Sequence, residues 1–174
     1  MAAVKACFFR RYGGPEVLEY GELPDPAAAA GEVLIEIHAA SINAADWKMR
    51  AGQYGAAVSF PHVPGRDFSG VMVSGGGFFK PGDAVFGVCE VPREGAYAER
   101  IAIREAIVAH KPEHLSFEEA ATIPVAFLTA YHALHHHGRM QARDRVLIHS
   151  ATGGVGLAAL QLARAAGAEV FATA

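Results

Sequence analysis

The sequence lacks long hydrophobic runs, an excess of charge of either sign, and a leader segment. No apolar run approaches the roughly 20 residues that a membrane-spanning helix needs. A formal net charge of −3 gives no basic surface for nucleic acid or for an anionic membrane. The first residues, 1–5, lack the charged start and apolar middle of a secretory signal. These absences predict a cytoplasmic protein that binds neither nucleic acid nor membranes.

Cysteine is also scarce. The two cysteines, Cys7 and Cys89, are far apart in the sequence and cannot form a disulfide framework or a four-cysteine zinc lobe. They are typical of buried thiols in a reducing compartment. The 174 residues are 52% hydrophobic, which suffices for one large domain or for one small domain plus part of another.

Short strands separated by glycine and proline dominate the first part of the chain. Between Glu32 and Ala39, for example, apolar residues alternate with polar ones, which is typical of a half-buried strand. The expected strands are residues 4–9, 17–22, 32–39, 68–74, 84–88 and 97–103. The pattern predicts an antiparallel β barrel or sandwich with few helices.

Helical patterns begin after Pro112. Ser116 and Glu119 form a capping box, which predicts a short helix that ends at Thr122, before Ile123 and Pro124. A second helix is expected over Val125–His137, ending at Gly138. The change in pattern places a domain boundary near residue 122.

A glycine-rich turn organises the last part of the chain. The apolar strand 146–148 precedes Ser150-Ala151-Thr152-Gly153-Gly154-Val155-Gly156, a helical pattern follows to a C-cap at Gly167, and Glu169–Thr173 begins a second strand. This order predicts a dinucleotide-binding βαβ unit whose phosphates lie at the helix N-terminus. Position 151 is expected to make the tight turn, Gly153 to admit the pyrophosphate and Gly156 to allow close helix packing. No Gly-Lys-Ser/Thr follows, which excludes a P-loop.

The residue that separates NAD binders from NADP binders is expected about 20 residues past the glycine turn. That point falls on Thr173 and Ala174, and the absence of an acid there favours NADP. Two parallel strands and one helix cannot bury both faces of a sheet. We therefore expect the beginning of a larger domain, the alternative being a short natural chain whose surface a partner covers.

Several segments together resemble the medium-chain dehydrogenase/reductase superfamily, in its zinc-independent quinone oxidoreductase branch. With the glycine turn, these are residues 41–52, 60–71, 79–87, 95–99 and 115–134, in the order of the family. The resemblance implies an N-terminal GroES-like β barrel over residues 1–122, followed by the first βαβ of an incomplete Rossmann domain over 123–174. It also implies that the chain is the N-terminal half of a protein that is a homo-oligomer at full length.

The zinc-dependent relatives carry a cysteine in the segment that here begins with Asn43, and Gly-His-Glu where this chain has Gly65-Arg66-Asp67. Because both ligands are replaced, no metal site is expected. Asp46 is expected to cap a helix that starts at Trp47. His132 and His136 could share a helix face, but a polar helix end explains them equally.

The resemblance implies hydride transfer from NADPH to a small electrophile, either a quinone or an α,β-unsaturated carbonyl. Asn43, Lys48 and Tyr54 are the candidate catalytic residues, as hydrogen-bond donors to a developing oxyanion. Thr129 and residues 150–156 are the candidate cofactor-binding residues. Two alternatives stay open: an enoyl thioester or enone reductase on the same scaffold, and a non-catalytic β-domain scaffold or interaction module.

Overall fold

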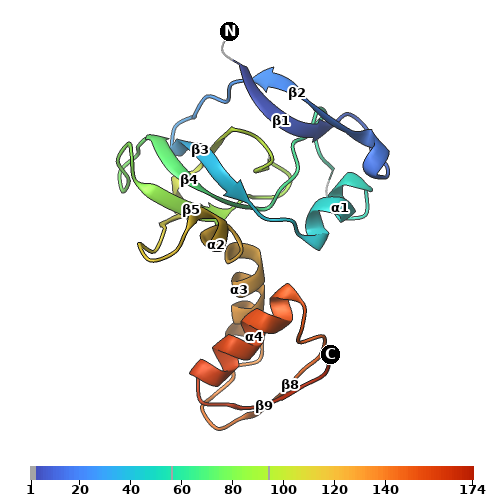
Figure 1. The fold of residues 1–174 in the computed structure, drawn as a ribbon, viewed down its shortest axis with the longest axis vertical. Coiled ribbons are helices and arrows are strands. Elements are labelled where there is room, and N and C mark those ends of the chain that lie inside the picture. The colour runs from blue at the N-terminus through green and yellow to red at the C-terminus, as the bar shows by residue number, and fades with distance from the viewer. Residues whose placement is uncertain (1–2, 56, 94) are drawn as a thin grey trace. The chain divides into compact units, whose positions relative to one another are not determined.

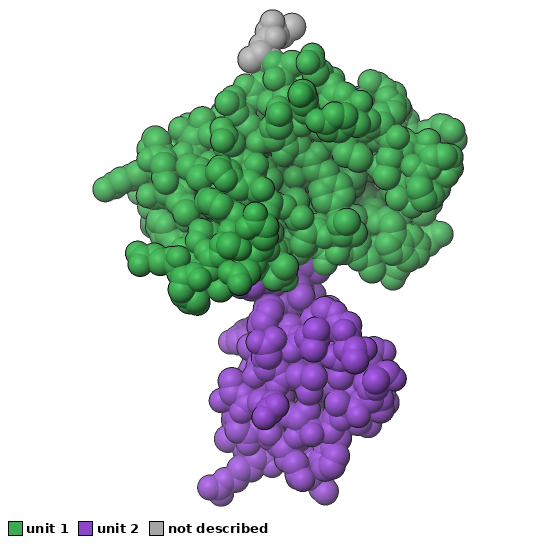
Figure 2. All heavy atoms as spheres, viewed as in Figure 1, with its two compact units in different colours: residues 1–122 green, residues 123–174 purple. Residues whose placement is uncertain are grey.

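The computed structural model describes residues 3–55, 57–93 and 95–174. The chain divides into two compact units, residues 1–122 and 123–174 (Figure 2). Strands predominate in unit 1, and unit 2 combines helices with a short parallel sheet (Figure 1). This confirms the mixed α/β class with a strand-rich first part.

The larger sheet of unit 1 is antiparallel and has the strand order β6-β3-β4-β5-β7. Its strands are β3 (Glu32–Ala40), β4 (Asp67–Ser74), β5 (Ala84–Val88), β6 (Arg100–Arg104) and β7 (Val108–His110). The alternation in β3 buries Val33 and Ile35, which pack with Phe68 and Met72 of β4. Alternating side chains of adjacent strands therefore make the core of unit 1.

A second, two-stranded sheet pairs β1 (Ala3–Phe9) with β2 (Leu18–Pro24). The 3₁₀ turn η1 (Pro15–Val17) lies between them, and single bridges join Ala6 to Ala98 and Phe9 to His62. Among the described residues, the strands of unit 1 are paired as these two open sheets and do not close a barrel.

The short helices of unit 1 are α1 (Ala44–Arg50) and α2 (Phe117–Ala121), with a 3₁₀ turn η2 (Glu105–Ile107). The predicted capping box of α2 is confirmed: Ser116 Oγ accepts from the Glu119 amide at 3.1 Å, and Glu119 Oε2 accepts from the Ser116 amide at 2.8 Å. Asp46 takes part in the cap of α1, but not at the predicted position. Asn43 is the N-cap residue of α1, and Asp46 lies in the first turn. The Asp46 carboxylate accepts a hydrogen bond from the backbone amide of Asn43 at 2.6 Å.

Unit 2 begins with α3 (Pro124–Tyr131), which continues as a π-helical turn, η3 (His132–His137). The predicted single helix over 125–137 therefore changes its winding at His132. The amide of Gly138 bonds to the carbonyl of Ala133, five residues back, at 2.9 Å. A regular α-helix would make this bond to the fourth residue back.

The rest of unit 2 is the βαβ arrangement β8 (Arg145–Ile148), α4 (Gly154–Ala165) and β9 (Glu169–Ala172), with β8 and β9 parallel. The C-cap of α4 is Ala166, and Gly167, predicted to be the C-cap, follows it in the left-handed conformation that ends many helices, with φ +79°. Small side chains dominate the core, among them Ala130, Ala158 and Ala163. On the strands, Leu147 and Phe171 form a cross-strand pair and remain 59% and 49% exposed.

In the part of the chain that the structure describes, no helix has the length and apolar character required to span a bilayer.

Candidate functional site

A hydrogen-bonded polar cluster lies at the N-terminus of α1. Ser41 Oγ donates to Asp67 Oδ2 at 2.6 Å, and Asn43 Nδ2 donates to Asp67 Oδ2 at 2.8 Å and to Ser41 Oγ at 3.0 Å. Asp67 is only 1% exposed. The side-chain nitrogen of Asn43 is therefore hydrogen-bonded inside the protein. In this arrangement Asn43 orders the cluster.

Asp46 and Tyr97 extend this cluster. Asp46 Oδ2 accepts hydrogen bonds from the Tyr97 hydroxyl, at 2.9 Å, and from the backbone amide of Asn43. The Tyr97 hydroxyl also lies 3.1 Å from the Ser41 carbonyl oxygen. Burial raises the pKa of Asp46 despite these hydrogen bonds. Burial, followed by the Asp46 charge, raises the pKa of Tyr97 far above its ordinary value. Tyr97 is thus a hydrogen-bond donor and not a source of protons near neutral pH.

Sequence reasoning did not identify Ser41 or Tyr97. Tyr97 lies 51 residues from its partner Asp46. The available signal was the Gly95-Ala96-Tyr97 segment, which belongs to the family pattern. The nearby Gly65 explains part of it: a Cβ there would lie 2.6 Å from the Tyr97 ring, so glycine makes room for the tyrosine.

Arg66 and Asp67 occupy the positions at which the zinc-dependent relatives carry His and Glu. The Nη1 atom of Arg66 is buried and has no hydrogen-bond partner among the described residues. Across residues 3–55, 57–93 and 95–174, no three His, Cys, Asp or Glu side chains are grouped so that they could hold a metal ion.

Lys48 and Tyr54 are exposed and lie on α1 and in the loop after it. Lys48 Nζ is 5.7 Å from the centroid of the Trp47 ring, and Tyr54 is 41% exposed. Within the described residues, neither side chain is hydrogen-bonded to the polar cluster. Both are exposed residues with a donor group that a ligand could use.

The glycine turn of unit 2 connects β8 to α4. Ala151 lies inside the tight turn, as the sequence predicted, because the Gly153 amide donates to the Ser150 carbonyl at 3.0 Å. The left-handed residue of the turn is Ser150, with φ +53°. Ala151 is buried, and its amide donates to the Thr173 carbonyl at 2.8 Å. This bond joins the turn to the chain beyond β9.

The N-terminus of α4 has free donors. The first intrahelical bond runs from the Leu157 amide to the Gly153 carbonyl at 2.8 Å, which leaves the amides of Gly154, Val155 and Gly156 without an intrahelical acceptor. A Cβ on Gly156 would lie 2.3 Å from the Ser150 carbonyl oxygen, so only glycine permits this close packing. A Cβ at Gly153 or Gly154 would make only ordinary contacts, 3.4 Å from the Ser150 carbonyl oxygen and 4.0 Å from Ala126 Cβ, and Thr152 and Thr129 are exposed. The arrangement suits an anion.

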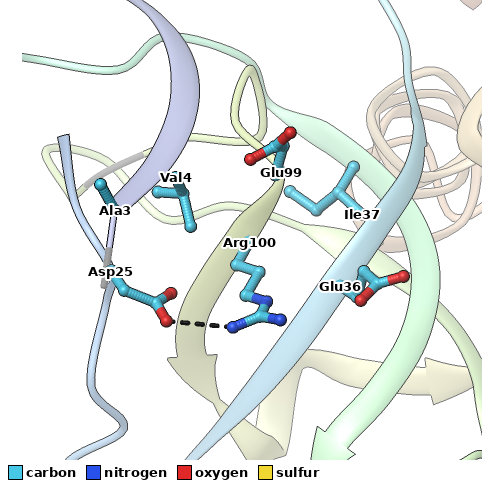
Figure 3. A pocket seen from close by; sticks show the side chains of 7 residues that line it. All are labelled: Ala3, Val4, Asp25, Glu36, Ile37, Glu99 and Arg100. Carbon is cyan, nitrogen blue, oxygen red and sulfur yellow. Dashed lines mark hydrogen bonds and ion pairs between the residues drawn. The ribbon is translucent and has the colours of Figure 1, made fainter. Parts of the chain in front are cut away.

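Unit 1 also contains a pocket of about 540 Å³ that the sequence did not predict (Figure 3). The Arg100 guanidinium donates to Asp25 Oδ2 at 3.0 Å, while Asp25 Oδ1 is buried without a partner. The other lining residues are Ala3, Val4, Glu36, Ile37 and Glu99. The pocket shares no residue with the polar cluster or the glycine turn.

Comparison with known proteins identifies the class. Residues 29–131 match the family model of the alcohol dehydrogenase GroES-like domain. The chain belongs to the medium-chain dehydrogenase/reductase superfamily, which confirms the resemblance found in its motifs. Within that superfamily the curated relatives include quinone oxidoreductases. That of Pongo abelii is 40% identical over 167 residues, which are 94% of this chain and 50% of the relative.

Solved structures of oxidoreductases are similar to the chain in fold as well as in sequence. The quinone oxidoreductase of Thermus thermophilus, whose structures include a complex with NADPH, has a TM-score of 0.82 and 40% identity over 97% of this chain and 52% of its own. The CurK enoyl reductase has a TM-score of 0.89 and 32% identity over 98% of this chain and 54% of its own. The chain spans about half the length of the curated relatives it matches.

Proposed function

We propose that the chain is part of an NADPH-dependent, zinc-independent oxidoreductase that transfers hydride to a quinone or an α,β-unsaturated carbonyl. In this proposal unit 1 is the GroES-like catalytic domain, and unit 2 is the first portion of a Rossmann nucleotide-binding domain. The kinship with quinone oxidoreductases supports the reaction class. When bound, the reduced nicotinamide supplies the hydride.

The α4 N-terminus is the observation that carries the proposal. The free amides of Gly154, Val155 and Gly156 would bind the pyrophosphate, and Gly153 leaves room for its approach. Ser150, Ala151 and Thr152 shape the rest of the turn, Ala151 through its backbone bond to Thr173. Thr129 is assigned to the nicotinamide side through the family resemblance alone.

In unit 1, the polar cluster includes Asn43, from the segment in which the zinc-dependent relatives carry a cysteine. Asn43, Ser41 and Asp67 hold one another, so we assign Asn43 to shaping the site. Lys48 and Tyr54, which keep exposed donors, are assigned to the developing oxyanion of the acceptor. A cytoplasmic homo-oligomer is part of the proposal. The free thiols of Cys7 and Cys89 support a reducing compartment.

Titration calorimetry with NADPH and a matched pair of variants tests the cofactor site. A Cβ at Gly154 meets only Ala126 Cβ, at 4.0 Å, so both Gly154→Ala and Gly154→Asp should fold. A carboxylate in the first helical turn favours the helix but repels a phosphate. We expect the wild type and Gly154→Ala to bind NADPH and Gly154→Asp to lose at least about tenfold in affinity. Equal binding by both variants contradicts the proposed phosphate site.

The similarity to CurK favours an enoyl thioester or enone reductase as the second candidate. An NADPH oxidation assay on the intact protein separates the two, with 1,2-naphthoquinone and a crotonyl thioester as competing acceptors. A higher kcat/KM for the quinone favours the quinone reductase, and a higher kcat/KM for the crotonyl thioester favours the enoyl reductase. Binding of neither NADPH nor NADH would favour the non-catalytic β-domain module.

A further inference from the structure

A cluster of histidines lies on the π-helical turn η3. Residues 131–138 contain no Asp, Glu, Lys or Arg, and their four histidines are His132, His135, His136 and His137. The function proposed above uses none of these side chains. Single π-helical turns are rare and occur frequently at functional sites, which makes η3 a candidate binding site.

The backbone of η3 is anchored on the inner side of the turn. The amide of the buried Met140 bonds to the Leu134 carbonyl at 2.9 Å, and the Leu134 side chain packs against the core of unit 2. In contrast, His132 and His136 are exposed. The turn therefore presents these two imidazoles to solvent on a backbone that is already ordered.

The spacing of His132 and His136 is suited to a shared ligand. The two residues are four apart in the sequence, which places side chains on the same face of a helix. Their ring centroids lie 5.5 Å apart, with an angle of 68° between the ring planes. Two imidazoles that bind one Zn²⁺ tetrahedrally, each with a Zn–N distance of about 2.1 Å, have centroids about 5 Å apart. The two rings thus lie close to the separation that one shared ion requires.

The other two histidines of η3 are placed differently. His135 is partly buried and lies against the Tyr131 ring, with the centroids 4.7 Å apart. The centroid of His137 is 5.0 Å from that of His136, but the two residues are adjacent, and adjacent side chains on a helix do not face each other. His132 and His136 are therefore the pair suited to chelation.

We propose that His132 and His136 form a bidentate site for a divalent transition-metal ion of the Zn²⁺ class. Imidazole is the commonest metal ligand in proteins and suits zinc, copper and nickel, and water completes the coordination. The ion links the first and fifth residues of η3 and so stabilises the π-helical winding. The site is independent of the proposed hydride transfer, so its test needs no dinucleotide.

Calorimetric titration of the 174-residue chain with ZnCl₂ tests the site, on protein without a histidine tag and in the presence of excess Mg²⁺. We expect one Zn²⁺ to bind per chain. His132→Gln and His136→Gln should each weaken binding at least about tenfold, because a single imidazole then remains. In NMR spectra of the wild type, the ring signals of these two histidines should shift on addition of Zn²⁺.

His137→Gln is the matched control, since His137 is exposed and belongs to the same turn but lies outside the pair, and its affinity for Zn²⁺ should equal that of the wild type. Circular dichroism of each variant confirms folding. Unchanged binding by His132→Gln or by His136→Gln overturns the proposal. Equal weakening in all three variants also overturns it, because it would show adventitious binding by the whole histidine cluster. Absence of saturable Zn²⁺ binding does so as well, and none of these outcomes affects the proposed function.

Discussion

Gly156 is fixed by backbone atoms that cannot move aside. A methyl group there would lie 2.3 Å from the Ser150 carbonyl oxygen and 2.6 Å from Ala151 Cα. We expect Gly156→Ala to destabilise unit 2 by about 1–3 kcal/mol through overpacking. Gly154→Ala is the control, because its Cβ has space and alanine favours a helix. Thermal unfolding of both variants checks this, and equal melting temperatures would contradict the close packing.

The buried His62 predicts a dependence of stability on pH. It is 1% exposed and packs against Phe9 and Met49, and burial lowers its pKa from 6.5 to about 4. Between these pH values the unfolded chain binds a proton that the folded chain does not. The free energy of unfolding should therefore fall as the pH drops through this window, by up to about 3 kcal/mol.

Urea unfolding at pH 7 and pH 4.5, followed by circular dichroism, measures this effect. His62→Phe keeps a ring in the site and removes the titrating group. The variant should lose less stability than the wild type between the two pH values, even if it is less stable at pH 7. An identical loss in both proteins would show that other groups cause the acid sensitivity.

At the scale of single elements, α2 depends on its cap. The helix has only five residues, so the two reciprocal bonds of Ser116 and Glu119 satisfy much of its first turn. Ser116→Ala should cost about 1 kcal/mol, whereas Ser116→Asp, which keeps an acceptor, should cost much less. Urea unfolding of the two variants makes the comparison. Equal destabilisation would mean that packing, and not the cap, sets the stability of α2.

The sequence predicted the elements whose signal is local. The alternation of Val33 and Ile35 located β3, and Ser116 with Glu119 located α2. It did not predict η3, because residues 132–137 continue the helical pattern and nothing local marks the change to π winding. The three-residue strand β7 was missed because it is too short for a periodic pattern.

The candidate sites also divide into those with a local sequence signal and those that depend on contacts between distant residues. The glycine turn was recognised because strand, turn and helix are contiguous in sequence, although its left-handed residue is Ser150. The network that joins Asp46 to Tyr97 could not be predicted, since only the folded sheets bring these residues together. The hydrogen bond from the Asn43 side chain to Asp67 joins residues 24 apart in the sequence and could not be predicted either.

At the scale of the whole molecule, the two units should differ in local stability. The core of unit 1 contains large side chains such as Ile35, Phe68 and Met72, whereas alanines dominate that of unit 2. Each large side chain buries more apolar surface and so contributes more to stability. We expect amides of β3 and β4 to exchange with deuterium at least about tenfold more slowly than those of β8 and β9. Equal protection in a hydrogen-exchange experiment would contradict this.

The single tryptophan lies in unit 1, so tryptophan fluorescence reports on that unit alone. Trp47 lies on α1 in unit 1, is 45% exposed and has the Lys48 ammonium over its ring. Intrinsic fluorescence excited at the indole band will therefore follow the melting of unit 1 and give no direct signal for unit 2. An emission curve with one clean transition would accordingly not establish that the whole chain melts together. A tryptophan introduced at Phe171, which is half exposed, would supply the missing reporter.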